Sequence, residues 1–264
     1  MEGTMRALRL RGEGDLALER LEIPRPGAGA ALVAVHAAGL TRDELTWPVD
    51  RLPATPSYEL SGTVVETDAD GVAAGDEVFG LAPFDRDGVA ADYAVVPVDV
   101  LAPKPRALSH VEAAALPLAG LSAWQGLFVH GRLEAGERVA ILGASGGVGH
   151  LAVQLAEIRG AHVIRDLSGP VDLLFDTAGA EALAGARGAL AEVGRIVSVA
   201  EEPPHGTYFV VEPDRLQLVE LARLVEDGRL RPSVDSVYEL TDAEDAFERL
   251  AQRGKRGKVV LRIA

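Results

Sequence analysis

The chain contains no cysteine among its 264 residues. Without cysteine there can be no disulfide, no thiolate nucleophile and no cysteine-based zinc site. The absence fits a reducing compartment.

Long apolar runs are also missing. No segment approaches the length that spans a bilayer, and the opening residues MEGTMRALRLRGEGD lack the apolar centre of a signal peptide. We therefore expect a cytoplasmic protein with no membrane partner.

Basic residues are the minority charge. Lysine and arginine number 26 against 40 acidic residues, a net charge of −14, so a phosphate backbone would be repelled and nucleic acid is excluded as an expected partner. Hydrophobic residues make up 48% and charged residues 25%, the balance of a globular protein with a sizeable core.

What is present divides the chain into two patterns. The first hundred residues hold short apolar segments bounded by glycine, proline or aspartate, which predict a compact, mostly β domain. These segments are MRALRL, LALERLEI, AALVAVHAAG, LSGTVVET, EVFGLAP and DYAVVPV.

The second pattern is helical and then alternating. Residues 109–131 predict a helix that breaks near Pro117 and is followed by another. From Glu137 onward, strands alternate with helices, which indicates a parallel sheet covered on both faces. Strands are expected at 138–144, 162–164, 171–179, 195–200 and 257–263, and helices at 147–160, 181–194, 214–227 (capped by Asp214) and 241–254 (with a Thr241–Glu244 capping box).

The strongest local signal is ILGASGGVGHLAVQLA. Gly143, Gly146 and Gly149 follow an apolar strand and open an amphipathic helix. This is the setting of a dinucleotide site, in which a tight turn lets a pyrophosphate approach the backbone at a helix N-terminus. The alternative is a turn that only packs.

These motifs, taken in order, resemble those of the medium-chain dehydrogenase/reductase superfamily, above all its zinc-independent quinone oxidoreductase and enoyl reductase branch. The resemblance extends to GKVVL at 257–261. The motifs that carry it are AAGL at 37–40, EAAALPLAGLSAW at 112–124, GASGGVG at 143–149 and FDTAG at 175–179.

The resemblance implies an α/β architecture of two domains. A GroES-like β-rich domain would comprise residues 1–118 and 232–264, and a Rossmann domain for NADPH would comprise 119–231. Homodimers are usual in this family. The glycine-turn residues implied to bind the cofactor are Gly143, Ser145, Gly146, Gly147, Val148 and Gly149.

The family's catalytic zinc is not expected here. Zinc-dependent members carry a cysteine within the loop that reads GLTRDEL in this chain, and Gly-His-Glu where it has Ser57, Tyr58 and Glu59. The cysteine is absent and Tyr58 replaces the histidine, so three protein ligands cannot be assembled.

Without zinc, the chemistry that the resemblance implies is hydride transfer to a small, apolar quinone or α,β-unsaturated carbonyl compound. Thr41 and Tyr58 are the candidate catalytic hydroxyls, either of which could donate to a carbonyl oxygen, and Trp47 could wall the pocket. Asp176, Thr177 and Gly179 match the strand end that lines the nicotinamide. Each also has a purely structural interpretation, as a turn or packing residue.

One part of the Rossmann domain is too short. Only Asp166–Pro170 separates the segments 162–165 and 171–176, whereas family members have a helix and a further strand there. Five residues reach at most about 18 Å, so we predict that the two segments cannot both lie parallel to the first strand on its opposite sides. The sheet should have fewer than six strands.

The missing unit normally forms the adenine side of the site. Arg165 and Asp166 stand where the second strand would read the ribose: an acidic residue there favours NAD, and a basic one NADP. We expect NADP(H), with NAD(H) as the alternative.

Two hypotheses of function remain. The chain is either an NAD(P)H-dependent oxidoreductase, or a cofactor-free redox-neutral enzyme (a cyclase, dehydratase or isomerase) or binding protein on a reductase scaffold. The retained glycine turn and FDTAG favour the first, and the shortened adenine side favours the second.

Overall fold

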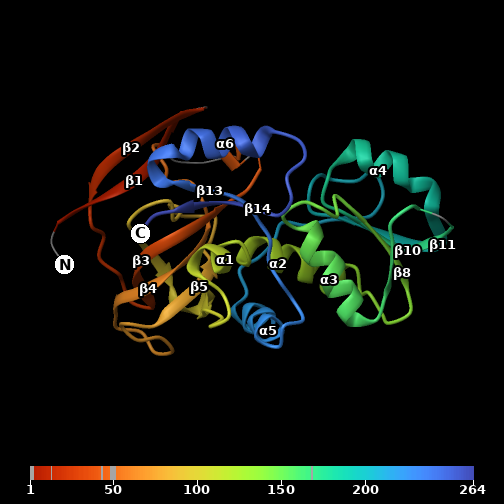
Figure 1. The fold of residues 1–264 in the computed structure, drawn as a ribbon, viewed down its shortest axis with the longest axis horizontal. Coiled ribbons are helices and arrows are strands. Elements are labelled where there is room, and N and C mark those ends of the chain that lie inside the picture. Colours follow the sequence, from red (N-terminus) through yellow and green to blue (C-terminus); the bar gives the residue numbers. More distant parts are fainter. Residues whose placement is uncertain (1–2, 13, 43, 48–51, 168) are drawn as a thin grey trace.

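The computed structural model of the chain describes residues 3–12, 14–42, 44–47, 52–167 and 169–264. Figure 1 shows a β-rich domain and a parallel sheet at opposite ends of the long axis, with helix α2 between them. The predicted fold class, a GroES-like β-rich domain with a truncated Rossmann domain, is confirmed.

The six strands predicted in the first hundred residues are all present. β1 and β2 form an antiparallel hairpin, and β3 is the centre of a larger sheet, where it pairs with β4 and β6. The six are β1 (Thr4–Gly12), β2 (Asp15–Glu22), β3 (Ala30–Leu40), β4 (Glu59–Thr67), β5 (Glu77–Leu81) and β6 (Tyr93–Pro97).

The C-terminal segment completes the β-rich domain. β14 (Lys258–Arg262) runs antiparallel to β3 and parallel to β13 (Val234–Glu239), giving the order β13-β14-β3-β4-β5-β7. The patterns did not predict β13 or the three-residue β7 (Leu101–Pro103), since both are short and partly polar.

The helices between the domains follow the prediction. Ser109 and Glu112 form a capping box on α1 (His110–Ala114), and Pro117 begins α2 (Pro117–Trp124), which continues as a π-helical turn, η3 (Gln125–His130). α3 (Gly149–Arg159) ends at Gly160, whose φ of +86° is the left-handed conformation that glycine adopts without strain.

Among the described residues, five parallel strands form the second sheet, in the order β12-β11-β10-β8-β9. This number agrees with the prediction of fewer than six. The strands are β8 (Arg138–Leu142), β9 (His162–Ile164), β10 (Val171–Asp176), β11 (Leu190–Ser198) and β12 (Thr207–Tyr208).

The predicted impossibility of the β9–β10 connection is wrong. β9 lies parallel to β8 on one side, with Ile164 beside Ala140, and β10 lies parallel on the other side, with Leu173 beside Val139. Because β9 has only three residues, the chain must return about 10 Å along β8 and move about 10 Å across it. The residues from 165 to 170 can reach about 20 Å, which is enough.

The crossover also takes over part of a helix's packing role. Leu167 packs with Ile164 on a core cluster that includes Ala140 and Leu174, the sheet face that α4 (Ala180–Ala186) covers through Leu183. The opposite face, with Ile141 and Phe175, belongs to the large core. Leu167 in the β9–β10 connection therefore helps α4 to cover this face of the sheet.

Two local predictions need correction. The helix expected over 181–194 stops at Ala186 and a short 3-10 turn, η4 (Arg187–Ala189), because glycines at 185 and 188 weaken it and Leu190 pairs with Val171 in the sheet.

The predicted Thr241–Glu244 capping box does not form. α6 (Ala243–Ala251) is preceded by a 3-10 turn, η5 (Leu240–Asp242), in which the hydroxyl of Thr241 donates to Asp242 instead. The Asp214 cap of α5 (Arg215–Glu226) is confirmed, since its carboxylate accepts from the amide of Gln217 at 3.0 Å.

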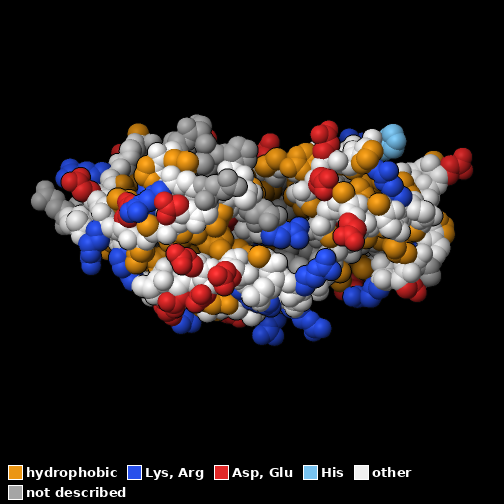
Figure 2. Space-filling view, turned by 90° about the horizontal axis from the view of Figure 1, so that it is seen from above, with side chains coloured by type: hydrophobic (Ala, Val, Ile, Leu, Met, Phe, Trp, Pro, Cys, Tyr) orange, Lys and Arg blue, Asp and Glu red, His pale blue; other side chains and the backbone are white. Residues whose placement is uncertain are grey.

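Acidic and basic side chains are interspersed over the face shown in Figure 2, without a continuous patch of either sign. Within the described ranges, no helix has both the length and the apolar character needed to cross a membrane.

Candidate active site

The glycine-rich turn joins β8 to α3 and is tightly closed at two of its glycines. A Cβ at Gly149 would lie 2.1 Å from the carbonyl oxygen of Gly143, and Gly143 itself has a φ of +80°. At Gly146, by contrast, a Cβ would meet only the oxygen of Gly143, at 3.3 Å. Gly146 is thus less crowded than Gly149, its amide donates to Gly143 O at 2.8 Å, and it lies next to the N-terminus of an 11-residue helix.

The C-terminal strand of the other domain holds this turn. Gly146 and Gly257 form an isolated parallel bridge, and the amide of Gly257 donates to Ser145 O at 3.1 Å. The next residue, Lys258, runs its side chain past Gly147, where an added Cβ would lie 2.8 Å from Lys258 Cδ. The turn therefore needs glycine at 147 to make room for a lysine from the neighbouring domain.

Beyond Gly147, the Lys258 ammonium enters a buried polar cluster that we call the Lys258 cluster, formed by Thr41, Glu44, Glu59 and Lys258. Lys258 Nζ forms an ion pair with Glu59 Oε1 and donates to Thr41 Oγ1 at 3.0 Å. Lys258 is 5% exposed and Glu59 1% exposed. Charges buried to this extent are retained only when they are paired and hydrogen-bonded.

Each carboxylate of the cluster is also held by backbone amides. Glu59 Oε2 accepts from the amide of Leu118 at 3.0 Å, in the first turn of α2, whose dipole favours a negative charge. Glu44 accepts from the amides of Thr41 and Ser57, at 2.8 Å and 2.7 Å. Both carboxylates are thus fixed in place.

Burial dominates the titration of both acids. Desolvation raises the pKa of Glu44 to about 7, against the opposing effect of its two amide donors and Lys258. Desolvation also raises the pKa of Glu59, and the ammonium of Lys258 opposes that shift.

Three aromatic rings stand beside the cluster. Trp47 stacks on Tyr58 at 6.1 Å between ring centroids, and Phe84 meets both rings edge-on. The two chain neighbours of Tyr58 are both held in place: the amide of Ser57 donates to Glu44, and Glu59 forms the ion pair with Lys258. The backbone of Tyr58 is therefore fixed. Of the predicted residues, Thr41, Trp47 and Tyr58 are therefore brought together at one place.

The predicted residues after β10 shape a turn. Asp176 is fully buried and accepts from the amides of Ala178 and Gly179 and from the hydroxyl of Ser198, and Thr177 Oγ1 donates to Leu142 O at 2.7 Å. A Cβ on Gly143 would lie 2.6 Å from Thr177 Oγ1, so this turn touches the glycine-rich turn.

Arg165 and Asp166 lie apart from the Lys258 cluster, at the exposed edge of the sheet. The guanidinium of Arg165 contacts Glu157 on α3 at 3.4 Å, with side chains that are 69% and 54% exposed.

Sequence reasoning missed Glu44, Glu59 and Lys258. Glu59 and Lys258 both lie in motifs quoted above, SYE and GKVVL, where they served only as family markers. Their 199-residue separation hides the ion pair from any local pattern. The one available signal was a lysine directly before the apolar run of Val259, Val260 and Leu261.

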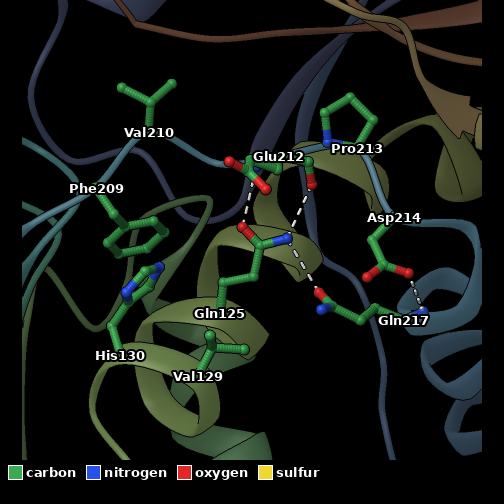
Figure 3. Close-up of a pocket in the computed structure, with 9 residues that line it drawn as sticks. All are labelled: Gln125, Val129, His130, Phe209, Val210, Glu212, Pro213, Asp214 and Gln217. Atoms are coloured by element: carbon green, nitrogen blue, oxygen red, sulfur yellow. Dashed lines mark hydrogen bonds between the residues drawn. The ribbon is translucent and has the colours of Figure 1, made fainter.

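A cavity of about 420 Å³ lies elsewhere, between η3 and the segment that leads into α5 (Figure 3). Gln125 binds the main chain of Glu212 with both ends of its amide, and His130 stacks on Phe209 at 4.5 Å. None of the predicted site residues lines this cavity.

Comparison with known proteins was made against family models, curated sequences and solved structures. Residues 27–106 match the model of the alcohol dehydrogenase GroES-like domain, and residues 158–261 match that of a zinc-binding dehydrogenase. The Arthroderma benhamiae protein named "Probable zinc-binding oxidoreductase, mitochondrial" is 30% identical over 308 residues, covering 94% of this chain and 93% of the relative.

The chain belongs to the medium-chain dehydrogenase/reductase superfamily. A further member, the chloroplast envelope quinone oxidoreductase homolog of Arabidopsis thaliana, is 27% identical, with 95% of both chains covered. Among solved structures, the quinone oxidoreductase of Coxiella burnetii has a TM-score of 0.89 at 28% identity and covers 99% of this chain and 100% of its own. Relatives of this superfamily are named as oxidoreductases, three of them as "NAD(P)H oxidoreductase", so this chain is an oxidoreductase-type protein.

The alignment to the Arthroderma protein also measures how much is missing from this medium-chain dehydrogenase/reductase. It extends over 308 positions, whereas 94% of this chain is about 248 residues, so about 60 positions have no counterpart here.

Proposed function

We propose that the chain is a zinc-independent, NAD(P)H-dependent oxidoreductase that reduces a small, apolar quinone or α,β-unsaturated carbonyl compound. The observation that carries this proposal is the path of Lys258, whose stem crosses the glycine-rich turn at Gly147 and whose ammonium donates to Thr41 Oγ1. One side chain thus joins the phosphate-binding turn to the candidate catalytic hydroxyl.

The residues present fit a nicotinamide nucleotide. The glycine-rich turn and the N-terminus of α3 would hold its phosphate, and the turn at Asp176–Gly179 would lie beside the nicotinamide. When bound, the nicotinamide supplies the hydride that is added to the substrate's β-carbon.

Thr41 is well placed to bind the substrate's carbonyl oxygen. It is partly exposed, whereas Lys258 and Glu59 behind it are buried. Thr41 Oγ1 accepts from Lys258 Nζ at 3.0 Å and donates to Glu59 Oε1 over a long contact of 3.5 Å, so substrate binding would turn the hydroxyl's hydrogen from Glu59 to the carbonyl oxygen, where negative charge develops during reduction. A donor polarised by a buried ammonium stabilises such a charge strongly. Trp47, Tyr58 and Phe84 would contact the apolar part of the substrate.

The same cluster supports independence from zinc. A lysine ammonium inside the cluster repels a divalent cation, the chain has no cysteine, and Tyr58 stands where zinc-dependent members carry a histidine. In the part of the chain that the structure describes, no group of three histidine or acidic side chains is arranged to hold a metal.

The test is a titration of the whole chain with NADPH and with NADH, followed by fluorescence of the reduced nicotinamide and by calorimetry. We expect saturable binding in the micromolar range, its loss in Gly146→Asp, and turnover with simple quinones or enones. If neither nucleotide binds up to millimolar concentration, the proposal is wrong. The alternative, a redox-neutral enzyme or a binding protein, then becomes the better interpretation of the Lys258 cluster.

A further inference from the structure

The parallel sheet ends early on one side of the glycine-rich turn. β9 is the edge strand, and its last residue, Ile164, pairs with Ala140, whereas β8 continues to Leu142. β9 therefore stops two residues short of the sheet end from which the glycine turn emerges. Among the described residues, no strand lies outside β9.

The residues that follow β9 lead away from the turn. Arg165 pairs with Glu157, which lies eight residues after Gly149 on α3, about 12 Å along the helix from its phosphate end. Leu167 then turns the chain with a φ of +53° and packs on the sheet face near Leu174. The segment that reads the adenosine ribose in a dinucleotide fold thus passes across a sheet face toward β10.

On the side of the glycine-rich turn that faces β10 and β14, the contacts expected of a nicotinamide site are present. Thr177 touches Gly143, Gly257 bonds Ser145, and Lys258 connects Gly147 to Thr41. A nicotinamide mononucleotide, made of the reactive ring, one ribose and one phosphate, needs only this side.

We propose that the chain holds its cofactor by the nicotinamide mononucleotide half alone, so that reduced nicotinamide mononucleotide binds about as tightly as NADH or NADPH. This inference rests on the proposed function and narrows its cofactor class. The adenosine of a dinucleotide would extend past the sheet edge toward solvent, where Arg165 already pairs with Glu157.

The experiment compares dissociation constants of the intact chain for reduced nicotinamide mononucleotide, NADH and NADPH, measured by nicotinamide fluorescence and calorimetry. We expect the three values to agree within about tenfold, a small difference for the addition of a whole nucleoside phosphate. Adenosine 2′,5′-bisphosphate, a probe for the adenosine side, should not displace the mononucleotide. Gly146→Asp should abolish binding of all three, because each presents a phosphate to the same turn.

The possible outcomes distinguish a failure of this inference from a failure of the reductase proposal on which it rests. If NADH or NADPH binds more than about tenfold more tightly than the mononucleotide, or if adenosine 2′,5′-bisphosphate displaces it, the inference is overturned and the reductase proposal stands. If no nicotinamide compound binds, the reductase proposal itself fails and the inference with it. Arg165→Ala is the matched variant on the adenosine side, and we expect it to leave the NADPH dissociation constant within about twofold of the parent value.

Discussion

On the side of the glycine-rich turn that meets the Lys258 cluster, Lys258 and Glu59 form an ion pair that is almost fully buried and is completed by Thr41 and the amide of Leu118. On the sheet-edge side, Arg165 and Glu157 form an ion pair whose side chains are more than half exposed. An exposed ion pair contributes about 0–1 kcal/mol to the free energy of unfolding, whereas removing one partner of a buried pair lowers that free energy by about 3–5 kcal/mol. The ion pair in the Lys258 cluster therefore contributes more to the stability of the fold than the pair at the sheet edge. The Lys258 cluster lies on the side of the turn that the shortened connection leaves intact.

The largest effect should come from removing the buried cation. Lys258→Met leaves the carboxylate of Glu59 buried without its ion-pair partner, so we expect the free energy of unfolding to fall by about 3–5 kcal/mol. Urea denaturation of the variant and the parent measures this difference. Arg262→Met removes a cation from the exposed end of the same strand, where Arg262 pairs with Glu239, and should cost less than about 1 kcal/mol. Equal losses in the two variants would contradict the comparison.

The next effect is a pH dependence. Because burial raises the pKa of Glu44 from 4.5 to about 7, the folded chain keeps a proton that the unfolded chain has released in this range. Glu44 therefore makes its full contribution to the free energy of unfolding below pH 4.5, and this contribution is lost as the pH rises through 7. At about 1.4 kcal/mol per pKa unit, the contribution of Glu44 to the free energy of unfolding amounts to about 3.5 kcal/mol.

The measurement is the unfolding free energy of the parent minus that of Glu44→Gln, followed between pH 4.5 and 8. The subtraction removes the titration of the other acids. We expect this difference to decrease as the pH rises, and a difference that is flat or increases would show that Glu44 is ionised throughout.

A third prediction sharpens the catalytic side. Thr41→Val removes the hydroxyl to which Lys258 donates, so we expect kcat/KM for enone reduction to fall about a hundredfold, or about 2.7 kcal/mol, with little change in KM. Tyr58→Phe is the matched loss of a hydroxyl. It should lower kcat/KM by less than about tenfold, because Lys258 donates to the hydroxyl of Thr41 and so polarises that group. The reverse order of the two losses would assign the catalytic donor to Tyr58.

The smallest effect belongs to the sheet edge. Arg165→Ala breaks the exposed pair with Glu157, and we expect the free energy of unfolding to change by less than about 0.5 kcal/mol. Denaturation at low and at high salt checks this, since the small contribution should disappear with screening. A loss above about 1 kcal/mol would show that the edge is more strongly coupled to the sheet than its exposure indicates.

Local patterns predicted most of the elements, because these depend on residues close in sequence. The glycine turn, the α2 start at Pro117 and the Asp214 cap are set within a few residues, and each formed where its motif stands. The Thr241–Glu244 capping box failed, since η5 takes up Thr241 before α6 begins. The strand β13 was missed because its alternation includes polar residues.

The candidate site was only partly visible in the sequence. Thr41, Trp47 and Tyr58 come from the two segments that correspond to the family's zinc-binding positions, and the fold brings them together around Glu44 and Glu59. Arg165 and Asp166 were expected at the cofactor, and whether they touch it stays a prediction for the titration to test.

By itself, the sequence determined the fold class, the superfamily and the absence of cysteine chemistry, because these depend on composition and on motifs read in order. Only the tertiary structure decided that β9 and β10 flank β8, because the reach of a connection depends on how little of β9 is paired. Only the tertiary structure paired Lys258 with Glu59 and Thr41. A buried charge needs a partner in space, and the chain supplies that partner from a strand almost two hundred residues away.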